Sequence, residues 1–358
     1  MKDPIRLNTF LGNPRVVEIL KRAIEQDRLP HAMIFAGPAG VGKCSLALLV
    51  AQYLNCLSPL DGGPCDQCSA CKRIAAVIQS RYLECENSKQ GGLCGTCPAC
   101  RVRSICHPDV HLVEPDKNTI RIEQVRELIG EIAFQPVEAK YRVVLFDPAE
   151  QMSPAAHNSL LKTLEEPPSR TVIILVTTNP YMLLETIRSR SRMLPFGEIP
   201  QHQIEQYLVE QYGRTAEDAR LAAALSGGSM AVALDFNTEA YQDIRQQALE
   251  FINLLFRGGK FTDASALAAQ VSKDKKVFQL WIDSVMAILQ DIYYADLAPE
   301  RVGQRDLLKI AKELSRKISH STLLRAIQKI RELKSKLSYN VNRQISLEAL
   351  FVELTRQP

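Results

Sequence analysis

The sequence lacks any long apolar run, and its first residues lack the apolar core of a signal peptide. No stretch of the 358 residues approaches the roughly 18 consecutive apolar residues that a membrane-spanning helix requires. The N-terminal segment, MKDPIRLNTF, has charged and polar residues where a signal peptide has its apolar core. Together these absences predict a cytoplasmic protein with no membrane among its partners.

The chain also has little net charge. Its 44 Lys and Arg residues are nearly balanced by 40 Asp and Glu, which leaves a formal net charge of +4. This charge is too small to indicate a nucleic-acid-binding protein. The balance is uneven in residues 301–343, where 12 Lys and Arg stand against Asp306, Glu313 and Glu332. That stretch is either a solvated helical face or a surface near DNA or an acidic partner.

Short apolar runs alternate with helical patterns in the first 197 residues. A chain of 358 residues is too long for one compact core, so two or three domains are expected. The runs are rich in β-branched residues and apolar almost throughout, which is typical of strands buried on both faces of a parallel sheet. Strands are expected at 31–37, 141–147 and 171–179, and helices at 43–55, 122–133 and 154–166. This alternation predicts a three-layer α/β domain.

The pattern changes after residue 197, and no convincing strand follows. Residues 198–240 contain short helical patterns broken at SGGS (226–229), and residues 241–358 contain longer amphipathic ones. The expected organisation is therefore an α/β domain at 1–197, a small helical domain at 198–240 and a larger helical domain at 241–358.

The segment GPAGVGKCS (37–45) has the spacing of a phosphate-binding loop. Gly37, Gly42 and Lys43 match the pattern G-x-x-x-x-G-K, and Gly40 lies between them. The segment follows an expected strand and opens an expected helix, which is the context that this loop needs. Glycines let backbone amides approach phosphates, the helix N-terminus favours their negative charge, and the lysine reaches the terminal phosphates. The segment therefore predicts a nucleotide-binding loop.

Several positions depart from the pattern of a nucleotide hydrolase. Cys44 stands where a hydroxyl would bind magnesium, and a neutral thiol is a poor ligand for that hard cation. Ser45 lies about 100° further round the helix, so it does not simply substitute. The second expected strand ends in Asp147, which either binds a metal or caps the following turn. Pro148 then replaces the Glu that polarises the attacking water, and Glu150 would need an unusual turn to act instead.

Eight of the ten cysteines form two matching sets. In a cytosolic protein of this size, clustered cysteines indicate a metal site rather than disulfides. The first set has the spacing C-x8-C-x2-C-x2-C, and four thiolates at such spacings close a tetrahedral zinc site with no open position. Its members are Cys56, Cys65, Cys68 and Cys71. We therefore expect a structural zinc ion at this first cysteine set.

The second cysteine set repeats the first with an offset of 29 residues at every position. Its members are Cys85, Cys94, Cys97 and Cys100. Internal duplication of a zinc knuckle is the simplest account, so one or two structural zinc ions are expected in residues 56–106. The alternatives are that the duplicated loop has drifted or shares ligands with the first set. His107 and His111 are expected to pack or cap rather than bind metal.

Three motifs together resemble the clamp-loader subunits of bacterial DNA polymerase III, which belong to the AAA+ class. They are FLGNPRVVEILKRAIEQDRLPHAMIFAGPAGVGK (10–43), NSLLKTLEEPP (158–168) and TIRSRSR (186–192). A further segment, 340–354, resembles the last helix of the family's collar domain. The resemblance therefore covers the whole chain. It implies an AAA+ domain with an inserted zinc knuckle, a helical lid domain at 198–240 and an oligomerisation collar at 241–358.

The resemblance also implies a hetero-oligomer with a role in DNA replication. The partners would be the other clamp-loader subunits, namely the ATPase gamma/tau subunits and delta. Through the complex, the chain would also act with the sliding clamp and primed DNA.

Within the family, three replacements favour the non-hydrolysing delta-prime branch over the ATPase branch. Cys44 replaces the hydroxyl residue, Pro148 replaces the water-polarising Glu, and Ala231 replaces the sensor Arg that the ATPase subunits usually have. These losses affect three separate parts of phosphoryl transfer. They imply a rigid stator subunit, and the intact glycines and lysine leave open the binding of ATP or ADP without hydrolysis.

One catalytic feature of the family is retained. The segment SRS (189–191) matches the family's Ser-Arg-Cys motif, with Ser191 in the Cys position. The match implies that Arg190 is an arginine finger, which acts on a phosphate bound by the neighbouring subunit. Thr178 and Asn179 match the polar first sensor, and they are expected to keep structure rather than orient a water.

Two alternative functions remain open. The chain could be an active ATPase subunit of the same loader that uses Ser45 and Glu150 in place of the usual residues. It could also be a zinc-dependent DNA-binding protein built on an inactive AAA+ scaffold. The cysteine sets have no interleaved aromatic and basic residues, which counts against the second alternative.

Overall fold

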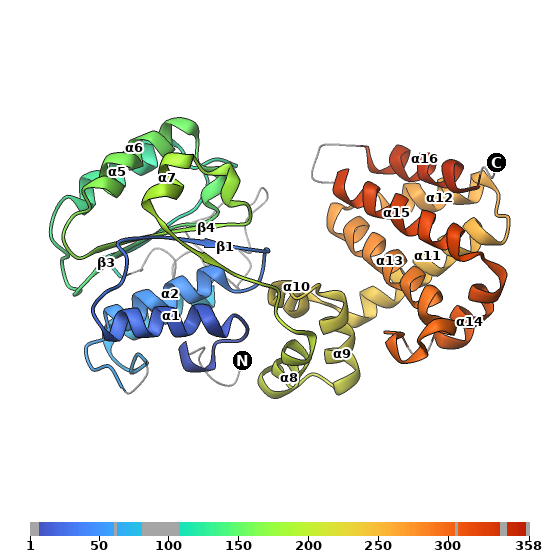
Figure 1. Cartoon of the computed structure of the whole chain (residues 1–358), viewed down its shortest axis with the longest axis horizontal. Helices are drawn as coiled ribbons and strands as arrows, with labels where there is room; N and C mark the ends of the chain where they lie inside the picture. The colour runs from blue at the N-terminus through green and yellow to red at the C-terminus, as the bar shows by residue number, and fades with distance from the viewer. Residues whose placement is uncertain are drawn as a thin grey trace. The chain divides into compact units, whose positions relative to one another are not determined.

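The computed structural model describes most of the chain as two compact units. The described residues are 7–60, 63–80, 107–116, 118–304, 307–336 and 342–355. The units are Met1–Leu234 and Asp235–Pro358 (Figure 1). Each unit has its own apolar core.

A five-stranded parallel sheet forms the centre of the first unit (Figure 1). Across the sheet the strands are β2 (Val110–Val113), β3 (Arg142–Phe146), β4 (Thr171–Thr177), β1 (Ala32–Ala36) and β5 (Arg192–Pro195). Every residue of β1, β3 and β4 is buried. This burial accounts for their almost continuous apolar sequences, because both faces of these strands are covered.

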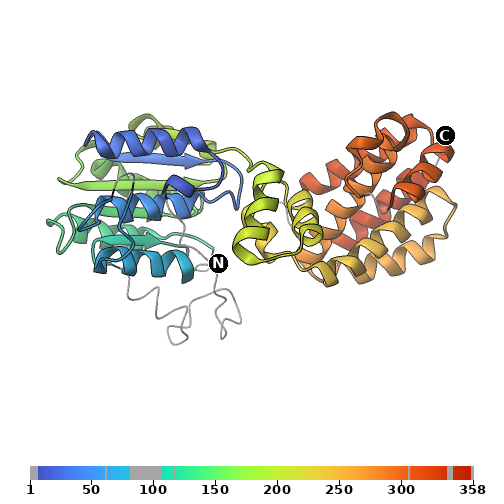
Figure 2. The ribbon, with the colours of Figure 1, turned by 90° about the horizontal axis from the view of Figure 1, so that it is seen from below.

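Helices cover both faces of the sheet (Figures 1 and 2). On one face lie α1 (Pro14–Glu25) and α2 (Lys43–Leu54), with α3 (Ser69–Ser80) packed against α2, and on the other lie α5 (Ile122–Ile132), α6 (Pro154–Glu165) and α7 (Glu185–Arg190). The three-layer α/β prediction is therefore confirmed, and the expected strands and helices agree with these bounds to within two residues. The short edge strand β5 was missed because only Leu194 in it is buried.

Short helices follow the sheet, as the sequence predicts. They are α8 (Gln201–Tyr212), α9 (Ala216–Leu225) and α10 (Met230–Asp235). Gly213 ends α8 with a φ of 66°, and Thr215 begins α9 by accepting a hydrogen bond from the Asp218 amide at 3.2 Å. We call α8, α9 and α10 the lid helices. The division into three domains stays a prediction.

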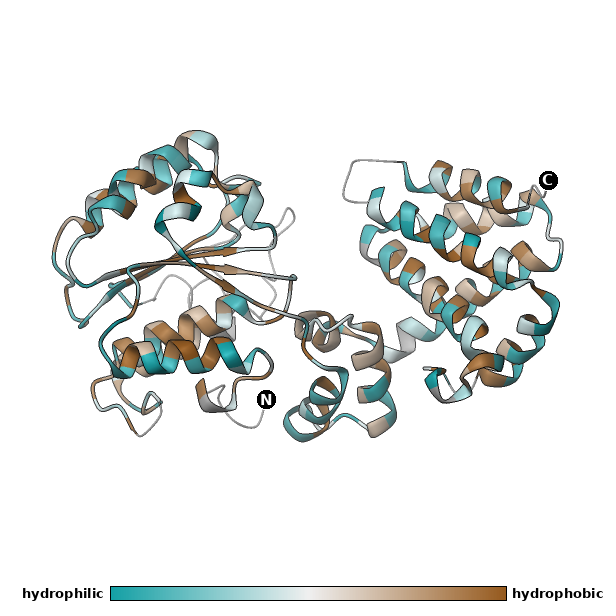
Figure 3. Cartoon of the chain, in the orientation of Figure 1, coloured by the Kyte–Doolittle hydropathy of each residue, from teal (hydrophilic) through white to brown (hydrophobic). Residues whose placement is uncertain are grey.

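The described part of the second unit is helical throughout. Its helices are α11 (Thr238–Phe256), α12 (Phe261–Val271), α13 (Lys275–Leu297), α14 (Leu308–Lys317), α15 (His320–Lys336) and α16 (Arg343–Thr355). Apolar residues line the inner sides of these helices (Figure 3). Trp281, which is 1% exposed, meets Phe251 edge-on at a ring-centroid distance of 5.0 Å and stacks on Phe278 at 6.1 Å. No helix among the described residues has both the length and the apolarity needed to cross a bilayer.

Candidate nucleotide site and metal centre

The phosphate loop connects the end of β1 to the start of α2, as its sequence predicts. Gly42 precedes α2 with a φ of 89°. Gly40 has a φ of 74°, and a side chain there would collide with the Ser229 hydroxyl group. The loop therefore needs glycine for its own turn and for the close approach of the segment before α10.

Lys43 is folded back onto this loop. Its ammonium group donates hydrogen bonds to the carbonyl oxygens of Gly37, at 2.7 Å, and Pro38, at 2.5 Å. The side chain is 6% exposed, and burial lowers the pKa of Lys43, although Asp147 and Glu150 oppose this effect by favouring the charged form. A bound phosphate would therefore have to replace the two carbonyl groups as the partner of the ammonium group.

The residues at the magnesium position are buried in the first turn of α2. Cys44 and Ser45 both lie there, each at less than a tenth of full exposure. The structure thus places a thiol, which prefers soft metals, where a magnesium-binding loop has a hydroxyl oxygen.

Beyond β3, the side chain of Glu150 is bound to the neighbouring strand. Pro148 follows Asp147 through a cis peptide bond, and Glu150 lies in a short 3-10 helix, Ala149–Gln151. One Glu150 oxygen accepts hydrogen bonds from the Thr178 amide at 3.0 Å and the Thr178 hydroxyl at 2.5 Å. Burial raises the pKa of Glu150, but these hydrogen bonds outweigh it and hold the pKa below its ordinary value. The second oxygen, Oε2, is buried without a hydrogen-bond partner among the described residues.

The residues of the expected first sensor have structural contacts. Thr178 is bound to Glu150, as described above. The side-chain oxygen of Asn179 accepts a hydrogen bond from the Tyr181 amide at 3.1 Å. Asn179 thereby begins the short 3-10 helix Pro180–Met182.

The lid helices touch the phosphate loop through backbone atoms. The Ala231 amide, at the start of α10, donates to the Gly40 carbonyl oxygen at 3.2 Å. The Ala231 side chain is a methyl group, so this position carries no guanidinium that could face a phosphate.

Arg190 is the last residue of α7, and α7 and α2 lie on opposite faces of the sheet (Figure 1). Its guanidinium group pairs with the Glu165 carboxylate at 2.7 Å and donates to the Thr186 carbonyl oxygen at 3.1 Å. The side chain is 37% exposed. Arg190 is therefore held by an exposed ion pair of the kind that contributes about 0–1 kcal/mol, and it can exchange this partner at little cost.

The first cysteine set converges in space, as its spacing predicts. The four Sγ atoms lie within 4.8 Å of one another. The Cys65 and Cys71 sulfurs are 3.9 Å apart, close to the edge of about 3.8 Å for a tetrahedron with metal–sulfur bonds of about 2.3 Å. The Cys65 amide also donates to the Cys56 sulfur at 3.2 Å, and the Cys68 amide donates to the Cys65 sulfur at 3.3 Å. These residues fit a tetrahedral metal ion with thiolate ligands.

The sulfur atoms of the first set differ in their proton affinity. Amide hydrogen bonds from Gln67 and Cys68 lower the pKa of Cys65 to about 6. Burial raises the pKa of Cys56 and of Cys71. Cys56 and Cys71 would therefore have to give up protons when a metal binds, whereas Cys65 already favours the thiolate.

The second cysteine set lies outside the described residues. This is the case for Cys85, Cys94, Cys97 and Cys100. The two nearby histidines have structural partners: the His107 ring accepts from the Asp109 amide at 3.2 Å, and the His111 ring lies 3.5 Å from the Glu131 carboxylate.

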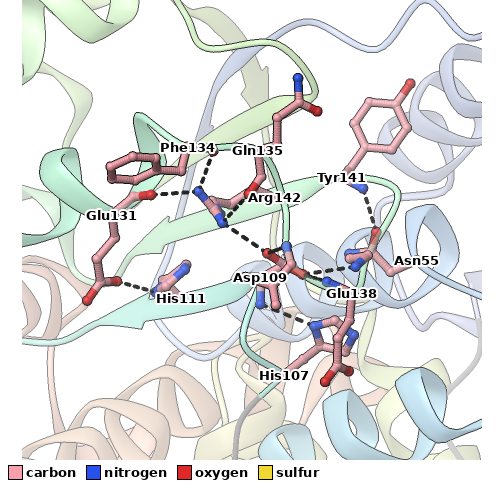
Figure 4. Close-up of polar contacts among 12 residues, drawn as sticks. Asn55, His107, Asp109, His111, Glu131, Phe134, Gln135, Glu138, Tyr141 and Arg142 are labelled. Carbon is pink, nitrogen blue, oxygen red and sulfur yellow. Dashed lines mark hydrogen bonds and ion pairs between the residues drawn. The ribbon is translucent and has the colours of Figure 1, made fainter.

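Sequence reasoning missed a buried ion pair beneath the loop 133–141, which joins α5 to β3 (Figure 4). Asp109 and Arg142 are 0% and 4% exposed, and their charged groups are 3.1 Å apart. Arg142 also donates at 2.8–3.1 Å to the carbonyl oxygens of Glu131, Phe134 and Gln135. Asp109 accepts at 2.8–2.9 Å from the amides of Val137, Glu138 and Ala139. An arginine inside the apolar run YRVVLFD is the one sequence signal that could have pointed to a buried partner.

The sheet, the phosphate loop between β1 and α2, and the lid helices against that loop define a P-loop α/β protein of the AAA+ class. A family model described as "DNA polymerase III, delta subunit" matches residues 12–83 and 75–200. The chain belongs to the delta-prime subunit family of DNA polymerase III. The resemblance stated from the sequence is thereby confirmed.

Similar proteins come from several bacteria. The chain is 32% identical to DNA polymerase III subunit delta' of Bacillus subtilis (strain 168), over 95% of both chains. It is 30% identical to the Pseudomonas aeruginosa delta' subunit, over 92% of both chains. The gamma/tau subunit of Mycobacterium tuberculosis is 30% identical over 63% of this chain and 35% of its own length.

The solved structures are more distant. A DNA polymerase III gamma-subunit-related protein from Thermotoga maritima is 16% identical with a TM-score of 0.39, over 94% of this chain and 98% of that chain. The Bacillus subtilis clamp loader delta protein is 11% identical with a TM-score of 0.31, over 95% of this chain and 99% of that chain.

Proposed function

We propose that this chain is a non-hydrolysing stator subunit of the DNA polymerase III clamp loader and acts in the cytoplasm. Its partners are the ATPase gamma/tau subunits and delta, and through the complex it acts on the sliding clamp and primed DNA. The two delta' relatives, which match over nearly their full lengths, support this assignment.

The side chains that follow β3 carry the non-hydrolysing part of the proposal. Among the described residues there, Pro148 takes the place of the water-polarising Glu, and Glu150 is bound through Oε1 to Thr178. A general base must lie within hydrogen-bond reach of the water that it activates. In addition, Cys44 has a thiol in place of the hydroxyl that binds magnesium, and Ala231 has a methyl group in place of the charge-stabilising Arg side chain.

Nucleotide binding without turnover is compatible with this site. The loop glycines and Lys43 are in place, so ATP or ADP can bind if phosphate oxygens replace the carbonyl groups that Lys43 now contacts. The nucleotide would then occupy a cradle formed by Gly37, Gly40, Gly42 and Lys43. Cys44, Ser45 and Asp147 line its magnesium side.

We expect the isolated full-length chain to show no steady-state ATP turnover above that of Lys43→Ala. The reason is that Pro148 stands where the base is expected, Glu150 is held against Thr178, and the Cys44 thiol replaces the magnesium hydroxyl. Turnover that is lost in both Lys43→Ala and Glu150→Gln would contradict this expectation and establish the active-ATPase alternative. Circular dichroism of both variants serves as the control for folding.

The catalytic contribution of the chain would come from Arg190. It lies at the exposed end of α7, and the exposed ion pair with Glu165 is weak enough to be given up for a phosphate. As an arginine finger, it would stabilise the negative charge that develops on ATP bound by the neighbouring subunit.

Both cysteine sets would hold structural zinc. Convergence of the first set and the amide hydrogen bonds to its sulfurs support the first ion. The equal spacing of the second set supports a second ion.

We expect metal analysis to find about two zinc ions per chain. Replacing Cys65 and Cys68 by serine should remove one ion, and replacing Cys94 and Cys97 should remove the other. Unchanged zinc content in the second double variant would contradict the duplicated-site hypothesis and leave the first site intact.

The DNA-binding alternative receives little support from the basic stretch 301–343. Acidic side chains lie beside several of its cations, which lowers the net positive potential that this surface offers to a polyanion. The pairs are Lys317–Glu313 at 2.8 Å, Lys329–Glu353 at 2.8 Å and Lys334–Asp283 at 2.7 Å.

A further inference from the structure

The loop 133–141 displays two large apolar side chains on a fixed backbone. Phe134 and Val137 are 75% and 74% exposed. The hydrogen bonds of Asp109 and Arg142 hold the backbone on both sides of them (Figure 4). The exposed apolar groups are therefore presented by a loop that is anchored from within.

Residues next to the first cysteine set hold the same loop from outside. Asn55, which precedes Cys56, accepts a hydrogen bond from the Tyr141 amide at 2.9 Å (Figure 4). Arg73, two residues after Cys71, forms an ion pair with Glu138. The cysteine set thus lies between two contacts, one to the end of the loop and one to its middle.

The two contacts come from different helices that meet at the cysteines. Asn55 caps the end of α2, whereas Arg73 lies in the first two turns of α3. Buried Gln52 of α2 reaches across and donates to the Cys71 carbonyl oxygen at 3.2 Å and to Asp66 at 3.1 Å. A metal ion bound by Cys56 and Cys71 would join these helices and fix the spacing of Asn55 and Arg73.

We propose that metal binding at the first cysteine set braces the loop 133–141, so that the position of Phe134 and Val137 depends on the metal. This inference rests on the proposed metal site. Four thiol groups within 4.8 Å of one another have no strong bond between them when the metal is absent. The link between the end of α2 and the start of α3 then depends on packing, on Gln52 and on weak hydrogen bonds to sulfur, such as that from the Cys65 amide to Cys56. The contacts of Asn55 and Arg73 loosen as a result.

Hydrogen exchange of the full-length chain tests the brace directly. The amides of Val137, Glu138 and Ala139 donate to Asp109, so they report whether the loop stays closed. We expect their exchange to speed up by about tenfold or more when zinc is removed with a chelator. The amides of β4, at the centre of the sheet, should not change.

A pair of variants separates the brace from general loosening. Arg73→Gln removes the contact to Glu138 without altering a cysteine, so it should speed exchange of the loop while zinc remains bound. Arg22→Gln breaks the exposed pair with Glu18 on α1 and should leave the loop unchanged. If zinc is bound and its removal leaves loop exchange unchanged, the brace is wrong and the metal site stands. If metal analysis finds no zinc bound to the first set, the metal site itself is wrong, and the brace with it.

Discussion

Replacing Arg190 with alanine is expected to slow ATP hydrolysis at the neighbouring subunit's site by about 10³-fold or more in the reconstituted clamp loader. The guanidinium group would no longer stabilise the charge that develops on the transferred phosphate. Only one site of the complex should be affected, so a single-turnover experiment should show a separate slow phase. Arg190→Lys should recover part of the rate, because it keeps the charge and loses the planar fork.

Arg192→Ala is the matched control for this prediction. Arg192 is an exposed arginine two residues further on, in the edge strand β5. Arg192→Ala should produce no slow phase. Both variants should assemble with the other subunits, because the side chains that they remove are exposed. An unchanged single-turnover time course for Arg190→Ala in an intact complex would rule out the finger.

Replacing Asp109 with asparagine is expected to lower the free energy of unfolding of the first unit by about 3–5 kcal/mol. The change leaves the Arg142 guanidinium buried without its counter-charge and weakens the acceptor for the loop amides. Urea titration followed by far-ultraviolet circular dichroism measures the effect. The double variant Asp109→Asn with Arg142→Gln should lose less free energy of unfolding than the two single variants lose in total, because the two groups interact directly.

An exposed pair in the same unit provides the control. Glu18→Gln breaks the ion pair with Arg22 on α1 and should change stability by less than about 1 kcal/mol. If Asp109→Asn lowers the free energy of unfolding as little as Glu18→Gln does, the buried pair stabilises the fold no more than an exposed pair.

The Asp109 effect should also depend on pH. Burial raises the pKa of Asp109, but the amides of Val137, Glu138 and Ala139 and the guanidinium of Arg142 outweigh it and hold the pKa below its ordinary value. Its charge therefore stabilises the fold at every pH above its unfolded-state pKa, about 3.9, and this contribution is lost as the pH falls through the lower folded-state pKa. The difference in the free energy of unfolding between the natural chain and Asp109→Asn should be constant near pH 7 and become smaller below about pH 4.

Local patterns made the sheet and the phosphate loop predictable. The strands β1, β3 and β4 are apolar because both of their faces are covered. Each can therefore be recognised in the sequence as a short, continuous apolar segment. The loop is readable because Gly37, Gly42 and Lys43 must lie at fixed spacing. The first cysteine set has fixed spacing for the same reason, and its four sulfurs do converge.

Contacts set by strand pairing could not be predicted in the same way. Asp109 meets Arg142 because β2 lies beside β3 in one register, with the Val143 amide bonded to the Asp109 carbonyl oxygen at 2.8 Å. Glu150 meets Thr178 because β3 lies beside β4. The partners are 33 and 28 residues apart, and no local periodicity records which strands become neighbours.

The single tryptophan makes the two units separately observable. Trp281 is enclosed by Phe251 and Phe278 in the core of the second unit, and the first unit contains no tryptophan. Its fluorescence should be emitted at short wavelength and shift to longer wavelength only when the second unit unfolds. In Asp109→Asn the part of the circular dichroism change that comes from the first unit should therefore move to lower urea, while the fluorescence transition stays in place. Each sample then has its own internal reference.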